Sequence, residues 1–362
     1  MKLVNDVKDS TKVLRIYDEK YEYSFGYYNN NEWVDENRLV LSRWKKNDST
    51  EFPNETELVL IDIKKGTETV LCDKETYGRN SFCYLVSRDK VYFLNKEDWL
   101  CSKDVNTGEI TKIHKRVTMV NPDITADGKY LIAAITLNKD TAQETYACLR
   151  VNLETGKAEE LFEKTFEKPM AYAGHKMICP TDEDKVFFCH EGNTHYVSNR
   201  LWLWTKYKGC YCLAKQRLNE NGDLGDCFGH ECWAPDGKGL YFVKYPCSPM
   251  KPTGICYVST EKEQTDVLYG KYGYWHVCAA KNGRFLAADT TGSDNKQPEY
   301  SRVCLIDMET GEEKMLIKAD ITWKHPCHPH PKFNLDSSLL MYHELYNGNT
   351  CVNIIKIEDV ID

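Results

Sequence analysis

The sequence has few of the features that mark exported, membrane-spanning or nucleic-acid-binding proteins. Its first residues, MKLVNDVKDSTKVLRIYDEK, lack the continuous apolar core of a signal peptide, and no stretch approaches the roughly 20 apolar residues that span a bilayer. The formal net charge is -8 and no basic run is present, which argues against nucleic acid as the main partner. We therefore expect a cytoplasmic protein that binds neither a membrane nor nucleic acid.

Two chemical motifs are also missing. None of the 16 cysteines belongs to a CxxC pair, and Cys148, Cys189 and Cys256 lie inside apolar, strand-like runs. We interpret the cysteines as reduced, small, buried residues of a reducing compartment. The G-x-S-x-G motif is absent as well, which makes a serine hydrolase an unlikely class for this chain.

Helical periodicity is nearly absent, and short strand-like runs separated by turns take its place. A turn signal recurs at intervals close to fifty residues and is followed each time by an apolar or alternating run. Asp-Gly and Asn-Gly between such runs are strong hairpin signals, because both residues tolerate positive φ. The predicted turns lie at Asp127-Gly128, Asp184, Asp236-Gly237, Asn282-Gly283 and Asp336.

A unit of about 40–50 residues that holds four short strands is typical of a β-propeller blade. The sequence therefore predicts an all-β, seven-bladed β-propeller, with residues 1–362 forming a single domain. A β-sandwich or a pair of domains is the alternative. The N-terminal segment is expected to supply a strand that closes the last blade. The predicted blades are 30–75, 76–117, 118–165, 170–217, 225–270, 272–319 and 323–362.

The histidines follow the same repeat. His230, His276 and His330 each lie six residues before a predicted turn, and His328 lies two residues before His330 on the same expected strand face. His325 comes just before them, and His175 stands at about the equivalent place in the preceding unit. An isolated histidine in a strand is usually an ordinary polar residue.

Histidines that share one phase of successive blades are expected to converge at one mouth of the propeller. Imidazoles crowded together need a metal ion or acidic partners. Zn, Mn, Fe, Ni and Cu all suit neutral imidazole, so the spacing alone leaves the ion open.

Four motifs together resemble the oligogalacturonate lyases, a family of seven-bladed, cytoplasmic, pectin-degrading enzymes. These motifs are CHEGNTHYVSNRLWLW (189–204), GHECWAPDG (229–237), YWHVCAAKNG (274–283) and HPCHPHPKF (325–333). They occur in the family's order and at comparable separations. The N-terminal half resembles the family only in its repeat rhythm.

The resemblance implies a manganese site made of three histidines and a glutamine. It places the histidines at His276, His328 and His330, whereas His325 occupies the glutamine position. A fourth imidazole in place of an amide oxygen makes the site softer, and a softer site favours Zn, Fe, Ni or Co over manganese. This departure leaves open whether the substrate is the family's usual one.

The resemblance also implies the chemistry, which is β-elimination in a 4-linked uronate. The family's general base falls on His230, and its arginine falls on Arg200, which is expected to grip a carboxylate in a bidentate manner. His190 and His175 are assigned to substrate binding. Glu191 is expected near Arg200, either to orient it or simply to pair with it.

Three alternatives remain open at this point. A metal-dependent hydrolase or a lyase acting on another uronate would use a similar site, although four imidazole ligands leave less room for a zinc-bound water. A non-catalytic, TolB-like propeller would act as a binding module. The expected partner is an anionic oligo-uronate, and an exposed edge strand could support a dimer without fixing one.

Overall fold

The structure is a computed structural model of the whole chain. It describes all residues except 28–29, 47–54, 78, 80–82, 116, 139–142, 168–171, 194–196, 263–264, 292–299, 324–325 and 362. His325, one of the predicted metal ligands, therefore lies outside the described residues.

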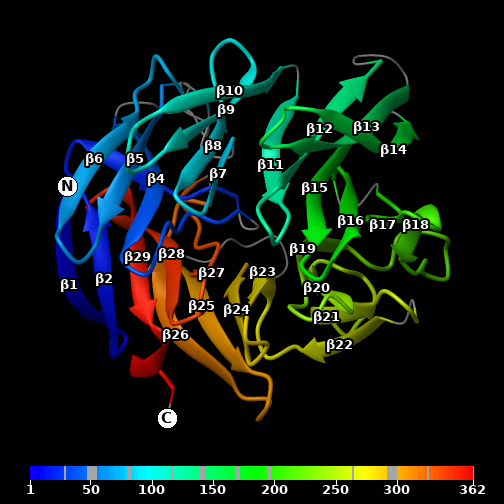
Figure 1. Cartoon of the computed structure of the whole chain (residues 1–362). Helices are drawn as coiled ribbons and strands as arrows, with labels where there is room; N and C mark the ends of the chain where they lie inside the picture. The colour runs from blue at the N-terminus through cyan, green and yellow to red at the C-terminus, as the bar shows by residue number, and fades with distance from the viewer. Residues whose placement is uncertain are drawn as a thin grey trace. The chain divides into compact units, whose positions relative to one another are not determined.

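The described residues form short antiparallel strands (Figure 1). A 3₁₀ turn, Ile357–Asp359, follows the last of them. The strands are β1 Lys2–Lys8, β2 Thr11–Tyr17, β3 Tyr21–Ser24, β4 Arg38–Lys45, β5 Glu57–Asp62, β6 Thr67–Cys72, β7 Tyr84–Ser87, β8 Lys90–Leu94, β9 Trp99–Asp104, β10 Ile110–Lys115, β11 Thr118–Ile124, β12 Tyr130–Leu137, β13 Gln143–Asn152, β14 Ala158–Glu167, β15 Tyr172–Cys179, β16 Asp182–Glu191, β17 Leu201–Thr205, β18 Gly209–Ala214, β19 Phe228–Trp233, β20 Gly239–Lys244, β21 Gly254–Ser259, β22 Thr265–Tyr269, β23 Tyr274–Ala279, β24 Phe285–Thr290, β25 Tyr300–Asp307, β26 Glu313–Asp320, β27 Lys332–Phe333, β28 Leu339–Tyr346 and β29 Asn349–Lys356.

Within the described part of the chain these strands build seven sheets, each an up-and-down meander. The sheets are β3-β4-β5-β6, β10-β9-β8-β7, β11-β12-β13-β14, β15-β16-β17-β18, β19-β20-β21-β22, β23-β24-β25-β26 and β1-β2-β29-β28-β27. Four-stranded meanders repeated along a chain are the blades of a β-propeller. The prediction of an all-β, seven-bladed β-propeller is confirmed.

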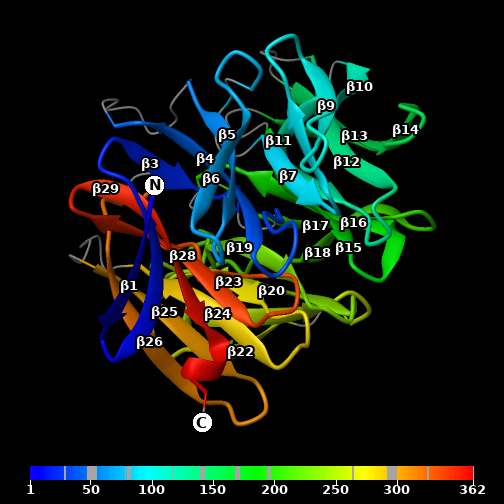
Figure 2. The same ribbon diagram turned by 60° about the vertical axis from the view of Figure 1, so that its left-hand side comes forward.

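The last sheet joins the two ends of the chain. The strand β2 pairs with β29 in antiparallel register, with Leu14 opposite Ile354 and Ile16 opposite Val352. The blue N-terminal hairpin lies beside the red C-terminal strands in both views (Figures 1 and 2). Because the ladder hydrogen bonds join distant segments, the N-terminal residues contribute directly to the stability of the C-terminal strands.

The described residues divide into two compact units. One comprises Met1–Lys115, Ala280–Asp289 and Gln297–Asp362, and the other comprises Arg116–Ala279 and Thr290–Lys296. The single domain over 1–362 and its blade limits stay a prediction. Among the described residues, no helix has the length and apolar character required to cross a membrane.

The turns form through local side-chain chemistry. The Asp236 carboxylate accepts a hydrogen bond from the Lys238 N–H at 3.0 Å, and Gly237 takes a φ of 70°, which glycine adopts without steric cost. One predicted turn is wrong. Asp184 lies inside β16, and the chain turns at Pro180–Thr181. Counted to Thr181, the second residue of this turn, His175 lies six residues before the turn, which is the spacing of His230 from Asp236.

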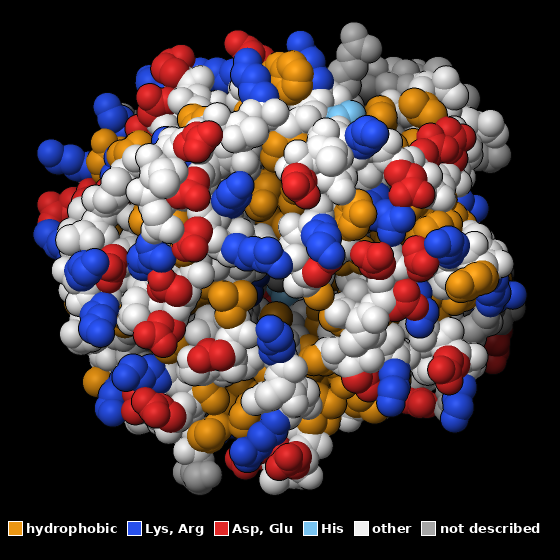
Figure 3. All heavy atoms as spheres, in the orientation of Figure 1, with side chains coloured by type: hydrophobic (Ala, Val, Ile, Leu, Met, Phe, Trp, Pro, Cys, Tyr) orange, Lys and Arg blue, Asp and Glu red, His pale blue; other side chains and the backbone are white. Residues whose placement is uncertain are grey.

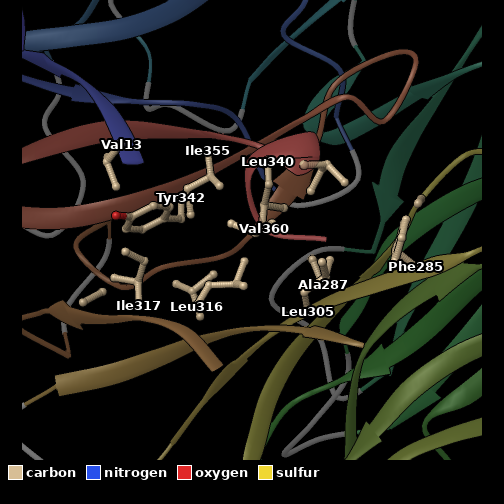
Figure 4. Packing of buried hydrophobic residues seen from close by; sticks show 14 residues of the cluster. Val13, Phe285, Ala287, Leu305, Leu316, Ile317, Leu340, Tyr342, Ile355 and Val360 are labelled. Carbon is tan, nitrogen blue, oxygen red and sulfur yellow. The ribbon is translucent and has the colours of Figure 1, made fainter. Parts of the chain in front are cut away.

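Buried side chains from strands of two sheets form one apolar cluster in the first unit (Figure 4). Leu340, Tyr342 and Ile355 are fully buried there and pack with apolar residues of β24, β25 and β26. Burying one such aliphatic side chain contributes about 1.5–3 kcal/mol. On the face drawn in Figure 3, basic and acidic side chains are interspersed, in line with 47 basic and 55 acidic residues.

The closing strand pair gives a stability prediction. Ile16 is 0% exposed in β2, whereas Val7 of β1 is 66% exposed. We expect Ile16→Ala to lower the free energy of unfolding by about 2–5 kcal/mol, because it leaves a cavity against β29. Val7→Ala serves as the control and should change it by less than about 1 kcal/mol. Urea denaturation followed by tryptophan fluorescence measures both, and equal effects would contradict a buried closing strand.

Candidate functional site

Two predicted site histidines occupy the same irregularity in neighbouring blades. The pairing of β15 with β16 shifts register between Gly174 and Met177, and that of β19 with β20 shifts between Gly229 and Cys232. Within these bulges His175 and His230 have φ values of 48° and 49°. A bulge re-aims the side chain of its strand, and a positive φ in a residue other than glycine marks strain that often serves function.

A glycine precedes each of these histidines and lets a second-strand side chain pass. An added Cβ on Gly174 would lie 2.7 Å from Glu191 Cγ, and one on Gly229 would lie 2.1 Å from Tyr245 Oη. Gly174 pairs with Cys189 and Gly229 with Val243, so each passing side chain lies two residues beyond the glycine's partner. The two blades thus share one backbone arrangement.

Arg200 lies at the centre of a buried charge cluster. Its Nε donates to Glu231 Oε1 at 2.7 Å, and its Nη2 donates to Glu191 Oε1 at 2.9 Å. Its backbone is fixed at the start of β17, because its N–H donates to Gln216 Oε1 and its carbonyl accepts from the His190 N–H. Its Nη1 also donates to Glu191 Oε2 at 3.5 Å, so all three nitrogens of the guanidinium are directed at protein carboxylates.

His175 bridges the same two carboxylates. Its Nε2 lies 3.0 Å from Glu191 Oε1, and its Nδ1 lies 3.0 Å from Glu231 Oε2. An ionised carboxylate only accepts hydrogen bonds, so a ring with two N–H groups makes both bonds together. The predicted role of His175 in binding substrate stays a prediction.

The cluster keeps its acids ionised. Burial opposes ionisation of Glu191, but the charges of Arg200 and His175 hold its pKa well below the ordinary value. The same balance lowers the pKa of Glu231, which is 0% exposed. These carboxylates and the guanidinium stabilise one another, because each would be costly to bury alone.

His230 lies beside this cluster in a different electrostatic environment. Burial, followed by the charges of His276, His175 and Arg200, lowers the pKa of His230 well below its ordinary value. Its ring lies 3.9 Å from that of His276, centroid to centroid, and 6.1 Å from that of His175. His276 itself stacks on Trp275 with centroids 4.6 Å apart. His230 is therefore neutral at pH 7 and able to accept a proton.

His190 projects to the other face of its strand. Its ring stacks on Phe166 with centroids 4.0 Å apart and an interplanar angle of 8°. Neighbouring residues of a strand point to opposite faces, and Glu191 is the one that turns to Arg200. The assignment of His190 to substrate binding stays a prediction.

In the first unit, the structure brings two predicted metal ligands together. The rings of His328 and His330 lie 4.4 Å apart, centroid to centroid, and the side chains are 1% and 4% exposed. His330 has a φ of 45°, and its N–H donates to Asp289 Oδ2 at 3.0 Å. Asp289 is fully buried and fixes the backbone that presents the histidine pair.

Comparison with known proteins gives the chain a family. A family model described as oligogalacturonate lyase matches residues 139–361, a region that contains every predicted site residue. The chain belongs to the oligogalacturonate lyase family. An oligogalacturonide lyase of Pectobacterium atrosepticum is 24% identical over 344 residues, covering 83% of both chains. An oligogalacturonate lyase of Dickeya dadantii is 24% identical over 341 residues with the same coverage.

The solved structures agree on the fold. An oligogalacturonate lyase in complex with manganese matches this chain with a TM-score of 0.81 at 19% identity, covering 98% of this chain and 96% of the other. The predicted resemblance to oligogalacturonate lyases, and with it the prediction of a lyase-like enzyme, is confirmed at the level of the family. The roles of individual residues in this lyase-family chain stay predictions.

Sequence analysis missed three residues that surround the predicted ones. These are Glu231, Tyr245 and Asp289. The repeated Gly-His pair in AGHK and FGHE was the available signal for Tyr245, because it marks the bulge that a second-strand side chain crosses. Asp289 had no such signal, since its bond to the His330 N–H joins residues far apart in the chain.

Removing one carboxylate charge from the cluster should have a large effect on the free energy of unfolding. Glu231→Gln should lower the free energy of unfolding by about 3–5 kcal/mol at pH 7, because it leaves Arg200 incompletely compensated. Glu159→Gln is the control: Glu159 is 63% exposed and pairs with Arg150 at 2.9 Å, so its loss should cost at most about 1 kcal/mol. Urea denaturation measures both.

The Glu231→Gln variant also tests how the stabilisation by Glu231 depends on pH. The folded-state pKa of Glu231 lies below the ordinary value of 4.5, so its stabilisation is complete above that pH and is lost as the pH falls. The gap between the natural protein and Glu231→Gln should therefore shrink below about pH 4.5. A constant gap between pH 7 and pH 3 would contradict an ionised Glu231.

Proposed function

We propose that this chain cleaves short oligogalacturonides, which are 4-linked uronates, by β-elimination, with His230 as the general base. Family membership supports a lyase acting on pectin oligomers. The observation that carries the finer proposal is the setting of His230: a strained bulge aims it, and burial with nearby positive charge keeps it neutral. A general base of this kind needs a free lone pair at the working pH.

The reaction begins with the hydrogen on C5 of the uronate, which lies next to the carboxylate. His230 accepts this proton, the C5–H electron pair forms the C4–C5 double bond, and the C4–O glycosidic bond breaks. The leaving oxygen takes up a proton, so the products together have the atoms of the substrate. No water is consumed.

Arg200 supports this step in two ways. Its positive charge helps hold the pKa of His230 low, and the family resemblance assigns its guanidinium to a carboxylate of the substrate. Glu191 and Glu231 fix the guanidinium in place.

A divalent metal fits the second part of the proposal. His328 and His330 are buried imidazoles side by side, and imidazole suits divalent transition metals. We assign His276 and His325 to the same ion on the family resemblance. When bound, the ion would neutralise the substrate carboxylate and so acidify the neighbouring C5 hydrogen.

Manganese is the first candidate ion, since a related lyase was solved with it. Zn, Fe, Ni and Co are the alternatives, because His325 replaces the family's glutamine. A cytoplasmic location stays a prediction, as do the oligomeric state and the absence of membrane and nucleic-acid partners.

The test of the proposed function is the reaction product. With digalacturonate, we expect galacturonate and an unsaturated or rearranged keto product that is lighter than galacturonate by the mass of one water, detected by ultraviolet absorbance and mass spectrometry. His230→Ala should lower kcat by about 10²–10⁴-fold and keep the bound metal, because it removes only the base. His114→Ala, on the outer strand β10, is the control.

Other outcomes of this assay are decisive. Two saturated galacturonates without an unsaturated or keto product would mark a metal-dependent hydrolase. Turnover only on other uronates would change the substrate, and metal without turnover on any uronate would favour a binding module. Near-normal turnover of His230→Ala would overturn the base assignment.

The metal proposal predicts a role for Asp289. Asp289→Ala removes the acceptor of the His330 N–H, and we expect metal affinity to fall by about 10–100-fold, as is usual when a supporting residue is lost. His328→Ala should lose both metal and turnover. Isothermal titration with Mn²⁺ and Zn²⁺ measures affinity independently of activity. Asp307→Ala, at the C-terminal end of β25, is the control, and equal affinities of the Asp289 and Asp307 variants would contradict the proposal.

A further inference from the structure

Tyr245 makes a close polar contact with the proposed base. Its Oη lies 2.5 Å from His230 Nδ1, and the two rings meet edge to face with centroids 5.9 Å apart. Burial raises the pKa of Tyr245 well above its ordinary value, so the contact is made by a neutral hydroxyl. Either atom can donate in such a contact, and which one does decides what His230 can do.

The backbone is built to permit this contact. The Tyr245 side chain crosses Gly229, where an added Cβ would lie 2.1 Å from Oη and 2.6 Å from Cζ. The Tyr245 N–H also donates to the Cys227 carbonyl at 2.9 Å, which fixes the residue beyond the end of β20. The hydroxyl therefore reaches Nδ1 because position 229 has no side chain.

The choice of donor sets the ring's tautomer. If Oη donated to Nδ1, the single proton of the neutral imidazole would sit on Nε2, and Nε2 could not accept another. If Nδ1–H donates to Oη, Nε2 keeps its lone pair. Which ring nitrogen carries the proton is set by the hydrogen bond that the other one makes.

We propose that Tyr245 is a positioning residue for His230: its hydroxyl oxygen accepts the hydrogen bond of Nδ1–H and so fixes the neutral ring in the Nδ1–H tautomer, in which Nε2 is the nitrogen that can take up a proton. This inference rests on the proposed function of His230 as a base. The Tyr245 side chain is partly exposed, which leaves its own O–H open to water.

The proton balance follows from this arrangement. The C5 proton moves to Nε2, and the ring becomes an imidazolium with N–H groups on both nitrogens. Tyr245 keeps its own proton throughout and accepts a stronger hydrogen bond from the charged ring than from the neutral one. Tyr245 therefore stabilises the charged state that forms during the reaction.

The first test removes the hydroxyl alone. In the full-length, metal-loaded protein, Tyr245→Phe should lower kcat by about 10–100-fold and leave KM within about twofold, because substrate contacts are unchanged. Tyr257→Phe, in the neighbouring strand β21 of the same sheet, is the matched control and should keep the natural kcat. Unchanged kcat in Tyr245→Phe would overturn the proposal.

The second test displaces the hydroxyl and keeps both polar groups. Gly229→Ala forces Oη away from Nδ1, so it should lower kcat to a similar extent. Combined with Tyr245→Phe its effect should be smaller than the product of the two single effects, because both changes break the same contact, although the added Cβ also lies 2.6 Å from Cζ of the ring. Effects that multiply in the double variant would show that Gly229 acts elsewhere and would overturn the displacement argument.

The third test reads the tautomer without reference to activity. Nitrogen NMR on protein labelled with ¹⁵N-histidine, with and without diamagnetic Zn²⁺, should show His230 as the Nδ1–H form. The His230→Ala spectrum identifies the signal, and Tyr245→Phe should shift the ring towards the Nε2–H form. An Nε2–H ring in the natural protein would overturn the proposal. If no uronate is cleaved, the proposed function fails, and this spectrum still decides the role of Tyr245.

Discussion

A guanidinium that is 4% exposed must be surrounded by acceptors, and this requirement organises the candidate site around Arg200. Glu231 and Glu191 each take one edge of the cation, and His175 bridges the same two carboxylates. Charges buried together in this way are held in one geometry, since moving any of them leaves another unpaired. Arg200 thus has a fixed position, and its field on the neighbouring His230 is fixed with it.

This arrangement explains how a neutral base can lie near two carboxylates. Free carboxylates would raise the pKa of a nearby histidine, but these two are already engaged by Arg200 and His175. Burial and the surrounding positive charge therefore dominate at His230 and lower its pKa. The cluster contributes to the proposed chemistry through this balance as well as through any direct contact of Arg200 with the sugar.

Much of the fold was accessible from the sequence, because blade strands and their turns are local features. The Asp236-Gly237 and Asn282-Gly283 pairs mark their turns, because the Asp or Asn side chain accepts a backbone N–H in the turn and the glycine takes a positive φ. The turn at Pro180–Thr181 lacks such a glycine, so the sequence pattern misplaces this turn at Asp184. The site was accessible only in part: the histidines follow the repeat, whereas Glu231 and Asp289 act through partners brought near by the fold.

The two Gly-His bulges show how one backbone arrangement produces two chemical outcomes. In β15 the side chain that crosses the glycine is Glu191, and the histidine is bound on both nitrogens by carboxylates. In β19 the crossing side chain is Tyr245, a neutral hydroxyl that touches only Nδ1 of its histidine in the contact described above. The residue that crosses the glycine therefore differs between a histidine held by carboxylates on both nitrogens and the histidine proposed as the base. Exchanging the crossing residues would therefore be expected to disable the base even with both histidines in place.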